Sequence, residues 1–89
     1  MQERKVTIIN KLGLHARAAS KFVNLAKRYA SKIEVLTVAK TVDGKSIMSI
    51  MLLAASQGTE IGLRIEGDDE VDAMQAIVDL IADRFGEGE

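Results

Sequence analysis

The only histidine of this 89-residue chain, His15, stands two positions before Arg17, and these two side chains suit phosphate chemistry. An imidazole ring is largely neutral at cytosolic pH and offers a nucleophilic nitrogen. An arginine guanidinium is a fixed cation, and its fork of N–H donors matches the oxygens of a phosphate. The pair therefore predicts a site that receives a phosphoryl group.

A helix is expected to begin directly after the histidine. Apolar residues recur from Ala16 onward at three- and four-residue spacing, which predicts a helix from Ala16 to about Lys27 with one buried stripe. The first backbone N–H groups of a helix lack intrahelical partners and lie at the positive end of its dipole. We therefore expect Gly13 to turn the chain and the amides of Ala16 and Arg17 to face an anion bound at His15.

Other chemistries find less support. A lone histidine before a helix is usually a cap or a solvated residue, so position alone is weak support for function. A hydrolase triad needs a second general base, and nothing near His15 suggests one. Gly44-Lys45-Ser46 resembles the end of a nucleotide-binding loop, but Ala39 stands where that loop requires its first glycine. The chain has no cysteine and no metal-ligand spacing, so no metal and no cofactor are expected.

The stretch Ile9-Asn10-Lys11-Leu12-Gly13-Leu14-His15-Ala16-Arg17 resembles the phosphorylation site of the HPr family. These proteins are histidine phosphocarriers of the bacterial phosphoenolpyruvate-dependent phosphotransferase system, in a sugar branch and a nitrogen branch. The resemblance runs nearly the whole chain. It implies that enzyme I passes a phosphoryl group to His15, that Arg17 stabilises it, and that an enzyme IIA type domain receives it. The chain would then be a carrier and not an enzyme by itself.

The same resemblance extends to Gly44-Lys45-Ser46-Ile47-Met48. In the family this stretch carries a regulatory serine, which implies phosphorylation of Ser46 by an HPr kinase/phosphorylase. Ser46 is also a good N-cap, and the two roles are compatible. One departure is Ala18, because most members have proline there; its absence removes about 0.4–1 kcal/mol of stability.

The resemblance also implies that the short helix after Ser46 docks partner proteins beside the histidine. We expect Ile47 in the core and Met48 and Met51 at the docking rim, because adaptable methionines suit surfaces that several partners share. Ser20 and Lys27 are the further docking residues that the resemblance implies.

The charge of the chain is unevenly distributed. Residues 1–45 hold 10 Lys and Arg against 3 Asp and Glu, whereas residues 46–89 hold 2 against 10. Aromatic residues are few and no recognition motif accompanies the basic half, so an acidic protein partner is favoured over nucleic acid. A small RNA-binding module, or a regulatory protein that has lost carriage, remains the alternative.

No segment has the length of a membrane span or the apolar core of a signal peptide, so we expect a cytoplasmic protein without membrane contact. We also expect a monomer.

Periodicity predicts the remaining elements, all within one domain over residues 1–89. Strands are expected at residues 5–9, 33–38, 41–42 and 60–66, with the second and third forming a hairpin and the fourth alternating strictly between buried and exposed residues. A short helix should cover residues 47–53 and end at Gly58.

A last helix should begin after Asp68 or Asp69. It is expected to bury Val71, Met74, Ile77, Val78, Ile81 and Phe85. The tail from Gly86 to Glu89 is expected to fray. The order β-α-β-β-α-β-α predicts an α+β fold: a two-layer open-faced sandwich in which three helices cover one face of a four-stranded antiparallel sheet, as the resemblance to HPr also implies.

Overall fold

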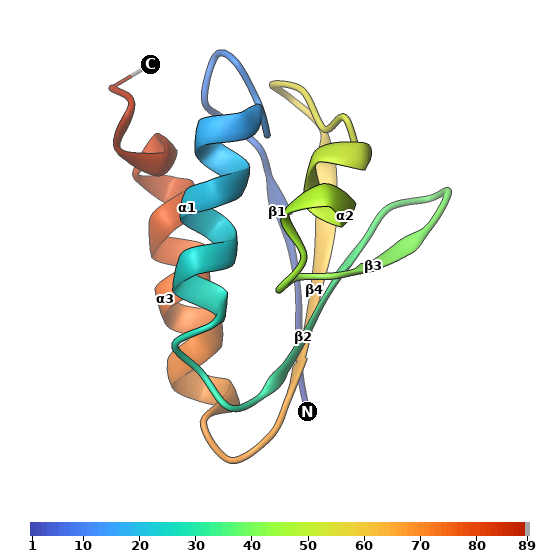
Figure 1. The fold of residues 1–89 in the computed structure, drawn as a ribbon, viewed down its shortest axis with the longest axis vertical. Helices are drawn as coiled ribbons and strands as arrows, with labels where there is room; N and C mark the ends of the chain where they lie inside the picture. The colour runs from blue at the N-terminus through green and yellow to red at the C-terminus, as the bar shows by residue number, and fades with distance from the viewer. Residues whose placement is uncertain (89) are drawn as a thin grey trace.

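The computed structural model describes residues 1–88, which form a four-stranded antiparallel sheet and three α-helices. The strands are β1 (Gln2–Thr7), β2 (Lys32–Leu36), β3 (Thr41–Asp43) and β4 (Glu60–Glu66), and the helices are α1 (Ala16–Ala26), α2 (Ile47–Leu52) and α3 (Glu70–Ala82), followed by the 3₁₀ turn η1 (Arg84–Gly86). Helices α1 and α3 run side by side, and α2 packs against α1 and β3 (Figure 1). The predicted two-layer α+β fold is confirmed.

The sheet has the strand order β1-β4-β2-β3, so the inner strand β4 pairs with two strands from earlier in the sequence, β1 and β2. The predicted alternation in β4 is confirmed: Ile61, Leu63 and Ile65 are at most 1% exposed, and the residues between them are not buried. The predicted hairpin of β2 and β3 is also present. The helices therefore cover one face of the sheet.

Three strands have different bounds from those predicted, and β3 differs only by including Asp43. Strand β1 begins at Gln2 and ends before Ile8, which is fully buried and exchanges backbone hydrogen bonds with Gly58 and Thr59 outside the sheet. Strand β2 ends at Leu36, because Thr37 closes a turn by donating its N–H to the Lys40 carbonyl at 2.8 Å. Residues with strand propensity continue past the ends of β1 and β2, so the sequence pattern does not mark where these strands end.

The core positions predicted for α2 are wrong in part. Ile47 is 39% exposed, whereas Ile50 is fully buried. A helix of six residues has room for one buried side chain on the face that meets α1 and β3, and Ile50 takes it. Gly58 does not end this helix; Ala54 provides the left-handed residue, with φ 50°.

Helix α3 also departs from its predicted core. Met74, Ile77 and Ile81 are buried, but Val71 is 62% exposed. Val71 lies two turns before Val78 on the same edge of the apolar stripe, and Val78 itself is only half-buried. At the first turn of the helix that edge meets solvent.

The prediction of a frayed tail is wrong for Gly86 and Glu87, whose N–H groups donate to Asp83 and Arg84. Phe85, just before them, is fully buried beyond the end of α3, and the chain then turns back toward the start of α1. Figure 1 shows η1 beside the first turns of α1. Glu89 lies outside the described residues. Within residues 1–88 no helix is long and apolar enough to cross a membrane.

Candidate functional site

The turn that precedes α1 holds His15 in place. Gly13 adopts φ 67° and donates its N–H to the Asn10 carbonyl, while the Asn10 amide donates to the Gly13 carbonyl at 2.7 Å. Leu14 is buried and donates its N–H to the Ala55 carbonyl at 2.8 Å. The turn is therefore fastened to itself and to the segment after α2 before the chain reaches His15.

His15 is the N-cap of α1. Its backbone is extended, with φ −73° and ψ 178°, and its carbonyl accepts the N–H of Ala19 at 2.8 Å. Its ring nitrogen Nδ1 accepts the backbone N–H of Arg17 at 3.3 Å. The predicted position of His15 at a helix N-terminus is confirmed, and one of the amides predicted to face an anion points to the ring itself.

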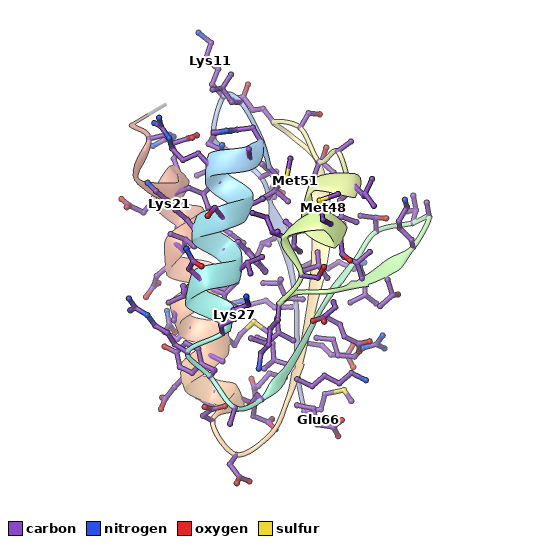
Figure 2. The ribbon with its side chains drawn as sticks, viewed as in Figure 1. Lys11, Lys21, Lys27, Met48, Met51 and Glu66 are labelled. Atoms are coloured by element: carbon purple, nitrogen blue, oxygen red, sulfur yellow. The ribbon has the colours of Figure 1, made fainter. Side chains whose placement is uncertain are left out.

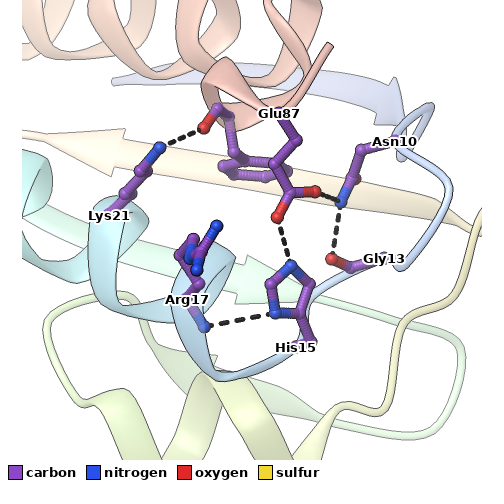
Figure 3. Close-up of polar contacts among 7 residues, drawn as sticks. Asn10, Gly13, His15, Arg17, Lys21 and Glu87 are labelled. Carbon is purple, nitrogen blue, oxygen red and sulfur yellow. Dashed lines mark hydrogen bonds and ion pairs between the residues drawn. The ribbon is translucent and has the colours of Figure 1, made fainter. Parts of the chain in front are cut away.

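The other ring nitrogen of His15, Nε2, pairs with a carboxylate oxygen of Glu87. The second carboxylate oxygen of Glu87 accepts a hydrogen bond of 2.8 Å from the Asn10 amide (Figure 3). The Glu87 side chain is 11% exposed and that of His15 29% exposed. Sequence reasoning missed Glu87; the only local signal was apolar Phe85 two residues earlier, at the spacing of the α3 stripe.

The surroundings of Glu87 keep its carboxylate ionised. The hydrogen bond from Asn10 is the largest factor that lowers the pKa of Glu87, and His15 and Arg17 lower it further, against the opposing effect of partial burial. Glu87 is thus an anion at neutral pH.

Both contacts of the His15 ring are satisfied by one neutral tautomer. A carboxylate only accepts hydrogen bonds, so Nε2 must carry a proton to donate to Glu87. Nδ1 must then be the unprotonated nitrogen, which agrees with its acceptance of the Arg17 N–H. The lone pair of Nδ1 therefore lies at the positive end of α1.

Arg17 lies on the first turn of α1, exposed to solvent, and Figure 3 shows its side chain beside the His15 ring. It is near enough to Glu87 for its charge to lower the pKa of that carboxyl. The structure therefore brings together the two residues on which the phosphate prediction depends.

The His15 side chain is open to solvent, with 29% of its surface exposed. Neither the hollow lined in part by Gly62 nor the one lined in part by Lys11 and Arg84 contains His15 or Arg17. Across residues 1–88 no group of three His, Asp or Glu is arranged to hold a metal ion. A reacting group must therefore reach His15 from outside.

Comparison with known proteins identifies the family of this chain. Residues 2–83 match the family model described as the PTS HPr component phosphorylation site. The chain belongs to the HPr family. It is 53% identical over 90 residues to the phosphocarrier protein HPr of Pseudomonas aeruginosa, covering all of both chains.

Solved HPr structures share the fold. The chain is 50% identical to an HPr of Thermoanaerobacter tengcongensis, with a TM-score of 0.94 and 98% of each chain covered. It is 38% identical to an HPr of Bacillus anthracis, with a TM-score of 0.84, over 88% of this chain and 93% of that one. The family match includes His15, Arg17 and Ser46, but it ends before Glu87.

Ser46 is the N-cap of α2. Its hydroxyl accepts the N–H of Ser49 at 3.4 Å, the outer limit of a hydrogen bond, so the cap is a weak one. The side chain is half-buried. Next to it, Lys45 donates to the Tyr29 carbonyl at 2.7 Å, which ties the start of α2 to the turn that follows α1.

The four residues predicted to dock partners come from α1, its C-cap and α2. Met48 and Met51 are 65% and 40% exposed on α2, which packs beside α1 (Figure 2). Ser20 is half-buried on α1. Lys27 caps the far end of α1, about 18 Å along the helix axis from His15 at 1.5 Å per residue. Leu52, next to Met51 on α2, is also exposed.

Proposed function

We propose that this chain carries a phosphoryl group on Nδ1 of His15. The observation that supports this most is the placement of the Nδ1 lone pair at the N-terminus of α1, with Arg17 on the first turn. Phosphoryl transfer asks a protein to position the acceptor and to offset charge on the phosphate oxygens. Backbone amides and a guanidinium fork do both.

Enzyme I is the proposed donor and an enzyme IIA type domain the proposed acceptor, as membership of the HPr family supports. The protein alone would catalyse no turnover. Because His15 lies on an open surface, donor and acceptor proteins can reach it in succession. The basic N-terminal half and the exposed Met48 and Met51 would contribute charge and apolar area to these contacts.

Family membership also supports cytoplasmic action and a regulatory role for Ser46. Phosphate on Ser46, from a kinase of the HPr kinase/phosphorylase type, would add about −1.5 to −2 charges beside the exposed apolar side chains of α2. Such a charge would weaken docking of an acidic partner.

Phosphoenolpyruvate and purified enzyme I test the proposal. Intact mass should show one added phosphate on the wild-type protein, and acid treatment should remove it because the bond to nitrogen is acid-labile. His15→Ala should remain folded by circular dichroism and take up none. Arg17→Ala should still accept phosphate, but more slowly, by a factor of roughly ten to one hundred if one charge-assisted contact of about 1.5–3 kcal/mol is lost.

The control separates the two candidate phosphate sites. Ser46→Ala should accept acid-labile phosphate at nearly the wild-type rate. Acid-stable phosphate, or labile phosphate that persists in His15→Ala, would show that His15 is not the carrier residue.

A further inference from the structure

The C-terminal segment 83–88 is built to present one side chain. After α3 the chain passes through left-handed backbone at Arg84, Phe85 and Gly86, with φ values of 54°, 55° and 74°. Two of these residues are not glycine, and such conformations persist only where surrounding contacts hold them. The segment then delivers Glu87 to the His15 ring.

Two contacts from other elements hold the segment down. Phe85 is fully buried, and its carbonyl accepts a hydrogen bond of 2.6 Å from Lys21 on α1. The Asn10 amide donates to the Glu87 carboxylate. Within the segment, the Glu87 N–H donates to the Arg84 carbonyl at 3.0 Å and closes the last turn.

Asn10 couples the two halves of the site. It is fully buried, and its amide donates both to Gly13, at 2.7 Å, and to Glu87, at 2.8 Å. The same side chain therefore fixes the turn that carries His15 and the carboxylate that opposes the ring. Glu87 uses one oxygen for Asn10 and the other for His15, so it needs two acceptor atoms. A glutamine has only one.

We propose that Glu87 is the positioning residue of His15: it holds the ring proton on Nε2 and thereby keeps Nδ1 as the nitrogen that receives the phosphoryl group. This inference rests on the proposed carriage by His15. Glu87 touches the ring at the nitrogen away from the transfer, so it acts through His15 and not on phosphorus.

The transfer step balances with this arrangement. The Nδ1 lone pair forms the bond to phosphorus while the bond from phosphorus to the donor protein breaks, and that electron pair leaves with the donor. The proton stays on Nε2. The ring becomes a phosphorylated imidazolium, and its positive charge remains next to the Glu87 carboxylate.

Nitrogen-15 NMR of the imidazole tests the role of Glu87 without any phosphate. In mildly alkaline solution, where imidazoles are neutral, the wild type should show one predominant tautomer with the proton on Nε2. In Glu87→Gln and Glu87→Ala that predominance should weaken toward a mixture of tautomers, because only the Arg17 N–H at Nδ1 still favours it. Asp83→Asn removes an exposed carboxylate four residues earlier and should keep the wild-type spectrum.

Initial rates with phosphorylated enzyme I provide the second measurement. Glu87→Gln should accept phosphate roughly tenfold more slowly, as expected for the loss of one hydrogen bond, and Asp83→Asn should not slow. Unchanged tautomers in both Glu87 variants would overturn the role of Glu87 even if His15 carries phosphate. A wild-type protein that takes no phosphate would instead overturn the carrier function, whatever the tautomer spectrum.

Discussion

The ammonium group of Lys21 donates a hydrogen bond of 2.6 Å to the carbonyl of Phe85, a residue 64 positions later in the chain. Lys21 lies near the middle of α1, one turn beyond Arg17, and Phe85 is the buried anchor of the C-terminal segment. In Figures 2 and 3 the Lys21 side chain reaches from α1 toward that segment. The helix that begins at His15 thus also holds the segment that brings Glu87 to it.

Lys21→Met should loosen this segment. It removes a charged donor and keeps most of the aliphatic stem, so the free energy of unfolding should fall by about 1 kcal/mol, a loss of about 4–8 °C in Tm. Hydrogen exchange of the amides of residues 86 and 87 should speed up more than that of α3. Lys27→Met, at the exposed end of the same helix, is the matched control. Equal exchange in the two variants would show that burial of Phe85 alone holds the segment.

Gly13→Ala should disrupt the turn that carries His15. An added Cβ would meet the Ala55 carbonyl oxygen and lie 2.7 Å from the Ser56 Cα, and the backbone is left-handed at φ 67°. The left-handed backbone alone costs about 1–3 kcal/mol, and the contact with backbone atoms adds to that. Denaturant titration should show the loss in unfolding free energy.

Gly58→Ala is the control for the Gly13 variant. Gly58 is also left-handed, at φ 90°, but nothing lies within 4 Å of an added Cβ. The loss of unfolding free energy in Gly58→Ala should therefore come from backbone strain alone and be smaller than the loss in Gly13→Ala. Equal losses would mean that the turn shifts without cost and that its close contact with Ala55 is unimportant.

Asp69 should give the protein part of its sensitivity to acid. Its carboxylate accepts the hydroxyl and N–H of Ser31 and the N–H of Ala30, and these bonds, the Ser31 hydroxyl first, lower its pKa from the usual 3.8. The unfolded chain therefore binds more protons than the folded one in this range, so stability is present above about pH 3.8 and is lost as the pH falls below it.

Urea titrations from neutral pH into this acid range test the Asp69 bonds. Asp69→Asn should be less stable than the wild type at neutral pH and lose less on acidification. A smaller acid slope should remain, because the pKa values of Glu70 and Glu87 are also lowered. Asp68→Asn, which alters the exposed neighbour, should follow the wild type. If Asp69→Asn followed the wild-type curve, these bonds would contribute nothing to acid stability.

The parts of the fold that were predictable are those with a local signal. Strict alternation over Glu60–Glu66 identified β4, and helical spacing after His15 identified α1. The errors for Ile47 and Val71 arise at the first turns of α2 and α3, where an apolar stripe continues in sequence but no neighbouring element covers it. Periodicity reports which residues share a face, not how far the opposing layer extends.

The candidate site divides in the same way. The placement of His15 and Arg17 at the start of α1 was predictable, because the turn, the helix start and the two side chains lie within a few residues. Glu87 was not, because its bond to His15 joins positions 72 residues apart and its approach depends on left-handed backbone at Arg84 and Phe85. Acidic residues between glycines at a chain end are typical of frayed tails. The local pattern therefore predicted a frayed Glu87, whereas its side chain contacts His15.

Ser46→Ala and Ser46→Asp together test whether Ser46 is more than a cap. The hydroxyl of Ser46 is 3.4 Å from the Ser49 nitrogen, so Ser46→Ala should cost only about 0.5 kcal/mol, the low end for an N-cap. Ser46→Asp should melt no lower than the wild type, because a carboxylate is favourable at the positive end of a helix and is itself a good cap.

Transfer from enzyme I should separate these two variants even where their melting temperatures do not. The carboxylate of Ser46→Asp would lie at the start of α2, whose exposed Ile47, Met48 and Met51 form the apolar surface proposed for docking. Desolvation of that charge, and its repulsion from an acidic partner, should weaken the complex, so initial rates of His15 phosphorylation at subsaturating protein should fall. Ser46→Ala introduces no charge and should keep nearly the wild-type rate. Equal rates for the two variants would leave Ser46 as a helix cap without a regulatory role.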